Sequence, residues 1–251
     1  MKRHIPNFLT MLNLLSGCIA VVLAVRNHLE LAALFVAIGI FFDFFDGLAA
    51  RLLNVKSELG VQLDSLADLV TSGLVPGIVM FQLFNQANGL NSYTWSGEST
   101  ESMFWVGDTF IAISFLGFLI TLASAYRLAK FNIDEDQATT FTGLPTPANA
   151  LFILSLPLIL KYHNNVTFDT LILSNWFLVV ITLLSAYMLN ARVRLFSLKF
   201  KGGKLRDNII KYTFLLLSLI LLIVMQFMAI PVIIVLYVVF SVIENSKGKL
   251  A

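Results

Sequence analysis

Four aspartates interrupt two otherwise apolar segments in this sequence of 251 residues. They lie within the stretch FFDFFDGLAARLLNVKSELGVQLDSLADLVTSGLVP at 41–76 and are Asp43, Asp46, Asp64 and Asp68. An aspartate at the centre of a membrane-spanning helix costs about 2.5–3.5 kcal/mol on insertion scales. We therefore expect an interaction that compensates for these charges, and its chemistry points to function.

The spacing of these residues places them on two helix faces, because residues three or four apart lie on the same side of a helix. The first face carries Asp43, Asp46, Gly47 and Ala50, and the second carries Gly60, Asp64 and Asp68. The loop between the two segments lets the helices run antiparallel with both faces on one cleft. We therefore expect the four carboxylates to converge near one end of this helix pair.

Few basic residues are available in this stretch to neutralise four carboxylates, since it contains only Arg51 and Lys56. Divalent cations are the simplest alternative, and ligation by oxygen alone suits Mg²⁺ or Mn²⁺ rather than Zn²⁺. Two such ions bridged by carboxylates are the usual apparatus for in-line phosphoryl displacement. Gly47 and Gly60 let a ligand or a helix approach closely, and Arg51 is suited to bind a phosphate. The pattern therefore indicates phosphoryl transfer.

The same residues form the pattern D-x2-D-G-x2-A-R-x8-G-x3-D-x3-D, which resembles the signature of the CDP-alcohol phosphotransferases. The resemblance implies a membrane-embedded homodimer of six core helices that cleaves a CDP-linked lipid, releases CMP and joins the phosphatidyl group to an alcohol. It implies that two metal ions are held by Asp43, Asp46 and Asp64. Asp68 is then the expected base and a shared metal ligand. The residues expected to bind CDP-diacylglycerol are Gly47, Ala50, Arg51 and Gly60.

Three further stretches resemble bacterial phosphatidylserine synthases of the membrane-integral type. They are IPNFLTMLNLLSGCIAVVLA at 5–24, SAYRLAKFNID at 124–134 and FTGLPTPANA at 141–150. This resemblance implies transfer of the phosphatidyl group from CDP-diacylglycerol to L-serine, which gives phosphatidylserine and CMP. It also implies that Asn7 and Thr10 approach the CDP moiety. Arg127 and Asn132 are expected to line the acceptor side.

Two alternatives stay open from the sequence. The first is the same chemistry with glycerol phosphate or inositol phosphate as acceptor. Such acceptors need a basic pocket, for which the candidates are Arg127, Lys130, Arg192 and Arg194. The second alternative is a divalent-cation transporter, because acidic residues inside a membrane also mark ion pathways. A transporter would keep the acidic cleft but would not need a cytidine nucleotide.

The composition is that of a membrane protein, with 58% hydrophobic and 13% charged residues and a mean hydropathy of +0.84. The formal net charge of +2 does not indicate a surface for nucleic acid. A single cysteine, Cys18, excludes an intramolecular disulfide and any multi-cysteine metal site. The three histidines do not form a zinc-binding motif. These features leave the bilayer as the expected surroundings and the aspartates as the expected metal ligands.

A spanning helix needs about 20 mostly apolar residues. The sequence offers such segments near 8–25, 29–49, 63–84, 104–128, 147–161, 171–190, 210–228 and 230–243. We therefore predict an all-α polytopic membrane bundle of about eight transmembrane helices in one domain over 1–251, and the family resemblance implies a six-helix catalytic core within it. The last two helices, within about 210–243, are expected to be peripheral. They form one apolar run broken only by Gln226 and Pro231, and we expect Pro231 to start the second helix.

The basic residues predict the orientation, because cytoplasmic loops are enriched in Lys and Arg. With the N-terminus inside, only Arg26 and Lys161 of the 17 basic residues fall outside. The polar segment 85–103 contains no Lys or Arg and is expected to be the longest outside loop. The sequence thus predicts a multi-pass protein of the cell (inner) membrane, with both termini and the active site cytoplasmic.

Overall fold

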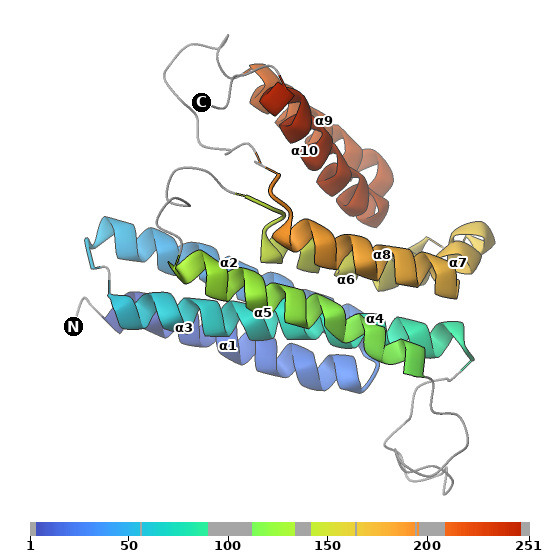
Figure 1. The fold of residues 1–251 in the computed structure, drawn as a ribbon, viewed down its shortest axis with the longest axis horizontal. Helices are drawn as coiled ribbons and strands as arrows, with labels where there is room; N and C mark the ends of the chain where they lie inside the picture. The colour runs from blue at the N-terminus through green and yellow to red at the C-terminus, as the bar shows by residue number, and fades with distance from the viewer. Residues whose placement is uncertain are drawn as a thin grey trace, which may run out of the picture.

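Helices make up almost all of the described chain in the computed structural model (Figure 1). The described residues are 4–55, 57–89, 112–133, 142–163, 165–193, 195 and 209–246. The all-α fold class expected from the sequence is confirmed. Lys56 and Arg194 lie outside the described residues. Most of the predicted outside loop at 85–103, from residue 90 on, also lies outside them.

The first two helices form an antiparallel hairpin. Helix α1 (His4–Val25) leads through a turn at Asn27, whose φ is 60°, into α2 (Leu29–Leu52). The buried face of α1 carries small residues, among them Gly17 and Ala20. Small side chains allow membrane helices to approach closely. A Cβ at Gly17 would collide with the Thr71 hydroxyl, so this glycine sets the distance between α1 and the third span.

The third span runs continuously over 30 residues from Glu58 to Ala87. It consists of α3 (Glu58–Asp68), the π-helical segment η1 (Leu69–Leu74) and α4 (Val75–Ala87). Ser57 caps its start by accepting a hydrogen bond from the Gly60 amide at 3.1 Å. The span therefore begins earlier than the predicted segment 63–84. Its π-helical segment follows directly after Asp68, and such segments often lie at functional sites.

Four further helices complete the bundle. The fourth span is η2 (Ala112–Gly117) with α5 (Phe118–Ile133), and α6 (Thr146–Tyr162) follows. Helices α7 (Val166–Ile172) and α8 (Asn175–Asn190) are bent by 61° relative to each other. Ser174 lies between them and caps α8 by accepting a hydrogen bond from the Phe177 amide. The main buried apolar cluster joins α1, α2 and α4 to α8.

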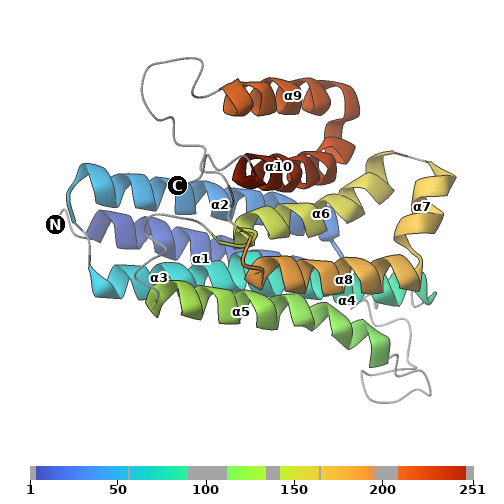
Figure 2. The ribbon, with the colours of Figure 1, turned by 45° about the horizontal axis from the view of Figure 1, so that its top comes forward.

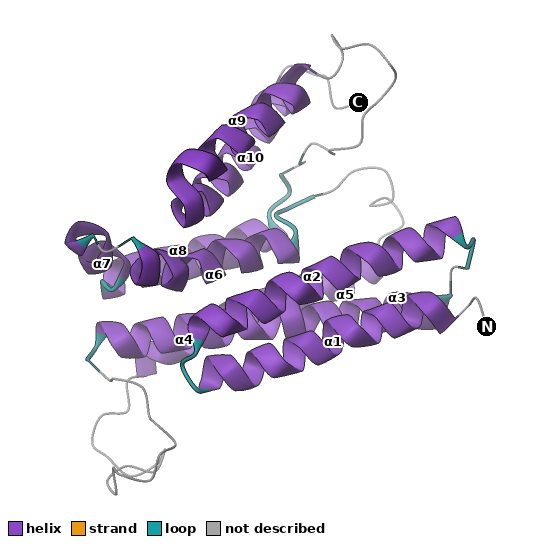
Figure 3. Ribbon diagram, turned by 180° about the vertical axis from the view of Figure 1, so that it is seen from behind, coloured by secondary structure: helices purple, strands orange, loops and turns teal. Residues whose placement is uncertain are grey.

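The C-terminal helices α9 (Ile209–Met225) and α10 (Ala229–Ser246) fold back on each other. The ring of Phe214 on α9 lies 5.9 Å from that of Tyr237 on α10. The chain reverses in the short helix η5 (Gln226–Met228), where Gln226 has a φ of 50°. The break predicted between two helices is thus present, although α10 starts before Pro231. Figures 1 and 3 show this hairpin at the edge of the helix bundle.

Five helical runs are long and apolar enough to cross a membrane, within the part of the chain that the structure describes. They are His4–Val25, Leu29–Leu52, Glu58–Ala87, Ala112–Ile133 and Lys211–Ile243, the last of which contains the α9–α10 hairpin. The bent pair α7–α8 makes a sixth, and α6 is a shorter apolar helix. A polytopic membrane bundle is therefore confirmed, and the number of eight crossings stays a prediction.

The bundle has two ends that differ in chemistry (Figure 2). At one end α2 passes into α3, close to the N-terminus of α1; we call this the aspartate end. At the other end α1 turns into α2 beside the C-terminal part of α4; we call this the opposite end. The four aspartates belong to the former, because they lie in the last part of α2 and in α3.

Candidate active site

Three of the four aspartates form a compact group where α2 and α3 meet. Asp43, Asp46 and Asp64 each place a carboxylate oxygen within 4.8 Å of the others. Asp46 is 6% exposed, and the other two are half-buried. We call these residues the three-carboxylate group. The two helix faces expected from the sequence spacing are therefore turned toward each other.

Asp68 lies one turn further along α3 and outside the three-carboxylate group. Its Oδ1 atom accepts a hydrogen bond of 3.3 Å from the side-chain amide of Asn13 on α1. Asp68 is thus held by α1, one helical turn from a member of the three-carboxylate group.

Helix α1 also holds a member of the three-carboxylate group. The Thr10 hydroxyl donates a hydrogen bond of 2.6 Å to Oδ2 of Asp46, and Thr10 is buried. The same hydroxyl lies 3.1 Å from the Pro6 carbonyl oxygen. A hydroxyl has one proton to donate, so these two acceptors compete for it. The contact with Asp46 is the shorter of the two and fixes that carboxylate.

The carboxylates have no cationic partner among the described residues. The ion pair among the described residues joins Lys161 to Glu30, at the opposite end of the bundle. Arg51 is exposed, and its Nε donates to the Gly47 carbonyl oxygen at 2.9 Å, so the side chain folds back along α2. Buried charges need a partner or a metal. Three oxygen donors in close array without a basic residue fit a divalent cation of the Mg²⁺ or Mn²⁺ type.

The residues expected on the nucleotide side surround this group. Asn7 at the start of α1 lies next to Gly60 at the start of α3, because a Cβ on Gly60 would be 3.3 Å from Oδ1 of Asn7. The Arg51 guanidinium lies beside Gly47, where Nη2 is 3.9 Å from the corresponding Cβ position. Ala50 is half-buried on the same turn. The structure thus brings these predicted residues to the aspartate end.

The two residues expected on the acceptor side take part in helix packing. Nη1 of Arg127 on α5 donates to the carbonyl oxygens of Thr142 at 2.8 Å and Leu189 at 2.6 Å. Asn132 accepts a hydrogen bond of 3.1 Å from Ser65, the neighbour of Asp64 in α3. Arg127 therefore joins α5 to the start of α6 and the end of α8. Contact with an acceptor stays a prediction for both residues.

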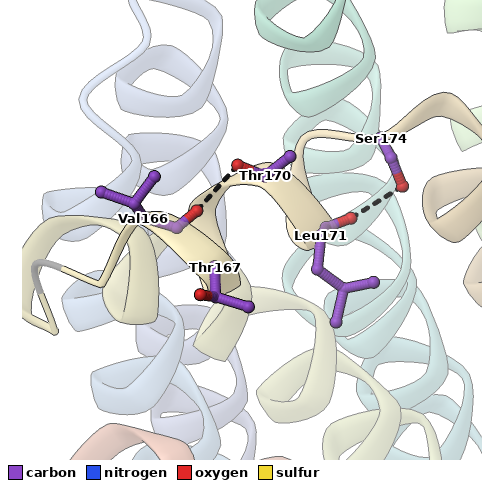
Figure 4. A pocket seen from close by; sticks show the side chains of 5 residues that line it. All are labelled: Val166, Thr167, Thr170, Leu171 and Ser174. Atoms are coloured by element: carbon purple, nitrogen blue, oxygen red, sulfur yellow. Dashed lines mark hydrogen bonds between the residues drawn. The ribbon is translucent and has the colours of Figure 1, made fainter.

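Two hollows lie on the described part of the chain, one beside Arg127 and one on α7. A small one of about 20 Å³ is lined by Arg127, Lys130, Thr142, Leu189, Asn190, Ala191 and Arg192. Its three basic side chains give it a positive charge. A wider, open hollow of about 510 Å³ lies on α7 (Figure 4) and is lined by Val166, Thr167, Thr170, Leu171 and Ser174. No charged side chain lines this hollow, and its residues are far from the aspartates in the sequence. It therefore has no part in the candidate active site.

Sequence reasoning missed Asn13 as a partner of Asp68 and Thr71 as a partner of Asn13. Asn13 is fully buried, and its backbone carbonyl accepts a hydrogen bond of 3.3 Å from the Thr71 hydroxyl. A signal for Asn13 was present, because Asn7, Thr10 and Asn13 recur every three residues in an apolar helix. Such spacing places polar groups on similar sides of a helix.

The chain is similar to proteins of known classification. The sequence pattern of the CDP-alcohol phosphatidyltransferases matches residues 3–183. A CDP-diacylglycerol–serine O-phosphatidyltransferase of Bacillus subtilis is 31% identical over 158 residues, which cover 61% of this chain and 75% of the relative. The enzyme of the same name from Helicobacter pylori is 28% identical over 242 residues, which cover 95% and 90%. The one from Saccharomyces cerevisiae is 31% identical over 169 residues, which cover 61% and 53%.

Proposed function

Because this chain belongs to the CDP-alcohol phosphatidyltransferase family, we propose that it transfers the phosphatidyl group of CDP-diacylglycerol to L-serine. The products are phosphatidylserine and CMP. Family membership makes the chain a phosphotransferase, and the named relatives support serine as the acceptor. The observation that carries the proposal is the three-carboxylate group, which unites the signature aspartates of α2 and α3 without a cationic partner among the described residues.

The metal-binding residues in this proposal are Asp43, Asp46 and Asp64, with Asp68 as a shared ligand. Two Mg²⁺ or Mn²⁺ ions held there would neutralise the carboxylates, polarise the diphosphate and stabilise the leaving CMP. Thr10 keeps Asp46 in place through its short hydrogen bond. Asn7, Gly47, Ala50, Arg51 and Gly60 form the side that receives the CDP moiety. Arg51 is exposed and free to leave its own helix for a phosphate oxygen.

Asp68 is the proposed general base. It lies beside the three-carboxylate group but is not part of it, so it has a separate position from which to receive a proton. It takes the proton of the serine hydroxyl while the hydroxyl oxygen attacks the lipid-linked phosphorus. The bond from that phosphorus to the CMP oxygen breaks in the same displacement. This assignment follows the family resemblance and the separate position of Asp68.

The identity of the acceptor distinguishes the proposed reaction from phosphatidyl transfer to glycerol phosphate or inositol phosphate. Glycerol phosphate and inositol phosphate carry a phosphate, and the basic hollow with Arg127, Lys130 and Arg192 is the observation that favours them. Nη1 of Arg127 already donates to two backbone carbonyl oxygens. Fewer of its N–H groups are therefore left to bind an acceptor phosphate. Serine needs only its carboxylate and ammonium groups recognised. Serine is therefore the acceptor we propose.

A panel of acceptors tests the proposal. Purified protein in detergent with CDP-diacylglycerol and Mg²⁺ is supplied separately with L-serine, glycerol 3-phosphate and inositol phosphate, and the lipid product is identified by mass spectrometry. We expect phosphatidylserine together with an equal amount of CMP. A lipid product made from glycerol 3-phosphate or inositol phosphate would show that serine is not the acceptor. The proposed phosphatidyl transfer would still stand. Metal binding without any effect of a cytidine nucleotide would favour the transporter.

The protein is a multi-pass membrane protein by its apolar helices, and we propose that its aspartate end faces the cytoplasm of the cell (inner) membrane. Support comes from the uneven distribution of Lys and Arg. Single cysteines on a Cys18-free background test this. A membrane-impermeant thiol reagent should label a cysteine at Thr167 from outside and one at Leu53 only after the membrane is opened. The homodimer stays a prediction that cross-linking in native membranes can test.

A further inference from the structure

Asn13 occupies a position that the proposed chemistry does not yet use. Its side chain is fully buried in α1, and its amide donates to Oδ1 of Asp68 at 3.3 Å. The two residues are 55 positions apart in the chain, so the contact exists only in the folded bundle. An amide donor orients a carboxylate but brings no positive charge. One of the two oxygens of Asp68 is therefore fixed without an ion pair.

The surroundings of Asn13 leave its amide little freedom. A Cβ on Gly39 of α2 would be 2.8 Å from Oδ1 of Asn13, so this oxygen rests against the bare backbone of α2. The Oδ1 atom has no hydrogen-bond partner among the described residues. The orientation of the amide is therefore set by packing against Gly39 and by its donor contact with Asp68.

A second contact fixes the backbone at the same place. The Thr71 hydroxyl donates to the carbonyl oxygen of Asn13 at 3.3 Å. Thr71 lies three residues after Asp68, in the π-helical segment η1. Helix α1 is thus joined to the third span at Asp68, through the Asn13 side chain, and at Thr71, through the Asn13 backbone. This arrangement holds Asp68 at a fixed distance from α1.

The same face of α1 acts on two aspartates. Thr10 donates to Asp46, and Asn13, one turn later, donates to Asp68. Each aspartate therefore has one oxygen held by α1 and one oxygen free of this contact. In the proposed function, this second oxygen of Asp46 would serve as a metal ligand, and that of Asp68 would serve as base and shared ligand.

We infer that Asn13 is a positioning residue for Asp68, which holds one carboxylate oxygen so that the other faces the acceptor hydroxyl. This inference rests on the proposed function, in which Asp68 is the base. It predicts that loss of the amide misplaces the carboxylate and lowers turnover, with little effect on the binding of CDP-diacylglycerol. A misplacement of about 1 Å can cost roughly 100-fold in rate.

A double-mutant cycle tests the inference. The values of kcat and of KM for CDP-diacylglycerol are measured for wild type, Asn13→Ala, Asp68→Asn and the double variant. We expect Asn13→Ala to lower kcat about 10- to 100-fold, with KM within about threefold of wild type. In the Asp68→Asn background the same change should lower kcat by less than about twofold, because residues that act as a unit are not additive. Equal losses in both backgrounds would overturn the inference.

The matched control is Asn85→Ala. Asn85 is also a buried asparagine, and it accepts a hydrogen bond of 2.8 Å from Ser114 at the opposite end. This variant should keep kcat within about twofold of wild type even if its melting temperature falls. A large loss of kcat in Asn85→Ala would mean that turnover reports general destabilisation, and the role assigned to Asn13 would be withdrawn.

A swapped pair covers the case in which Asn13→Ala does not fold. Asn13→Asp combined with Asp68→Asn exchanges donor and acceptor and keeps the atoms of the contact. This variant should fold with a melting temperature near that of wild type and turn over no faster than Asp68→Asn. Wild-type turnover in the swapped variant would overturn the inference. If wild-type protein makes no phosphatidyl lipid, the proposed function fails; if it does and Asn13→Ala keeps its kcat, only the positioning role fails.

Discussion

The two ends of this bundle handle polar groups in opposite ways. At the opposite end, neutral amides satisfy one another and the backbone: Gln82 donates to the carbonyl oxygen of Val25 at 3.0 Å, and Gln86 donates to Oδ1 of Asn27 at 2.9 Å. At the aspartate end, three carboxylates gather without a cationic partner among the described residues. Satisfied polar groups join helices, whereas gathered like charges work against stability and indicate a ligand.

The comparison also separates two kinds of contact made by α1. Its C-terminal end accepts hydrogen bonds from Gln82, a contact that only connects helices. Its N-terminal half donates to Asp46 and Asp68 through Thr10 and Asn13. One helix therefore has a structural end and an end that orients the proposed catalytic groups.

The largest effect is expected for the three-carboxylate group. Asp43→Asn, Asp46→Asn and Asp64→Asn keep the side-chain shape but remove a negative ligand. We expect each to lower the initial rate about 10³-fold or more and to weaken metal-dependent CMP binding. Calorimetry with CMP and Mg²⁺ measures the binding. A variant that binds metal and nucleotide normally would remove that aspartate from the ligand set.

Asp68→Asn should behave differently, because its proposed role is to accept a proton. We expect kcat to fall about 10²–10⁴-fold, as for the loss of a general base. Metal-dependent CMP binding should change much less than in Asp64→Asn. Stopped assays and calorimetry on the same preparation compare the two variants. Loss of metal as complete as in Asp43→Asn would make Asp68 chiefly a ligand.

A smaller effect is expected at the junction of α5, α6 and α8. Gly143 has a φ of 72°, and a Cβ there would be 2.6 Å from the Leu189 carbonyl oxygen and 2.7 Å from Nη1 of Arg127. Gly143→Ala should therefore destabilise the protein by about 1–3 kcal/mol. The melting temperature in detergent measures this. An unchanged melting temperature would show that the backbone around residue 143 shifts to accept a Cβ without loss of stability. It would also show that the hydrogen bonds of Arg127 do not require a glycine there.

The smallest effect is expected at the opposite end. Gln86→Ala removes a partly buried hydrogen bond to Asn27 and should cost about 0.5–1.5 kcal/mol of stability. Its specific activity should match wild type once the folded fraction is equal. A loss of kcat comparable to that of Asp68→Asn would remove the distinction between the two ends.

Local spacing predicted the aspartate faces well, because three- and four-residue steps fix which side chains share a helix side. The interruption of the apolar run by Gln226 and Pro231 predicted two C-terminal helices, and the second starts at Ala229 rather than at the expected Pro231. The start of the third span was predicted too late, because the cap at Ser57 was not considered.

Contacts between distant residues were not predictable from one sequence. The hydrogen bond from Asn13 to Asp68 depends on how α1 packs against α3. The π-helical segment Leu69–Leu74 reads LVTSGL, a mixture of apolar and small polar residues that does not distinguish it from an α-helix. Arg127 was expected at an acceptor, but two backbone carbonyl oxygens bind it in the folded chain. Tertiary packing decides all three features.

The most direct test of the central claim is the dependence of CMP release on a divalent ion. Purified wild-type protein with CDP-diacylglycerol and L-serine is assayed after removal of metal by EDTA and again after Mg²⁺ or Mn²⁺ is restored. We predict no CMP above background without metal, and recovery of CMP and phosphatidylserine in equal amounts when the ion returns. Full turnover in metal-free buffer would contradict the account of the three-carboxylate group as a metal site.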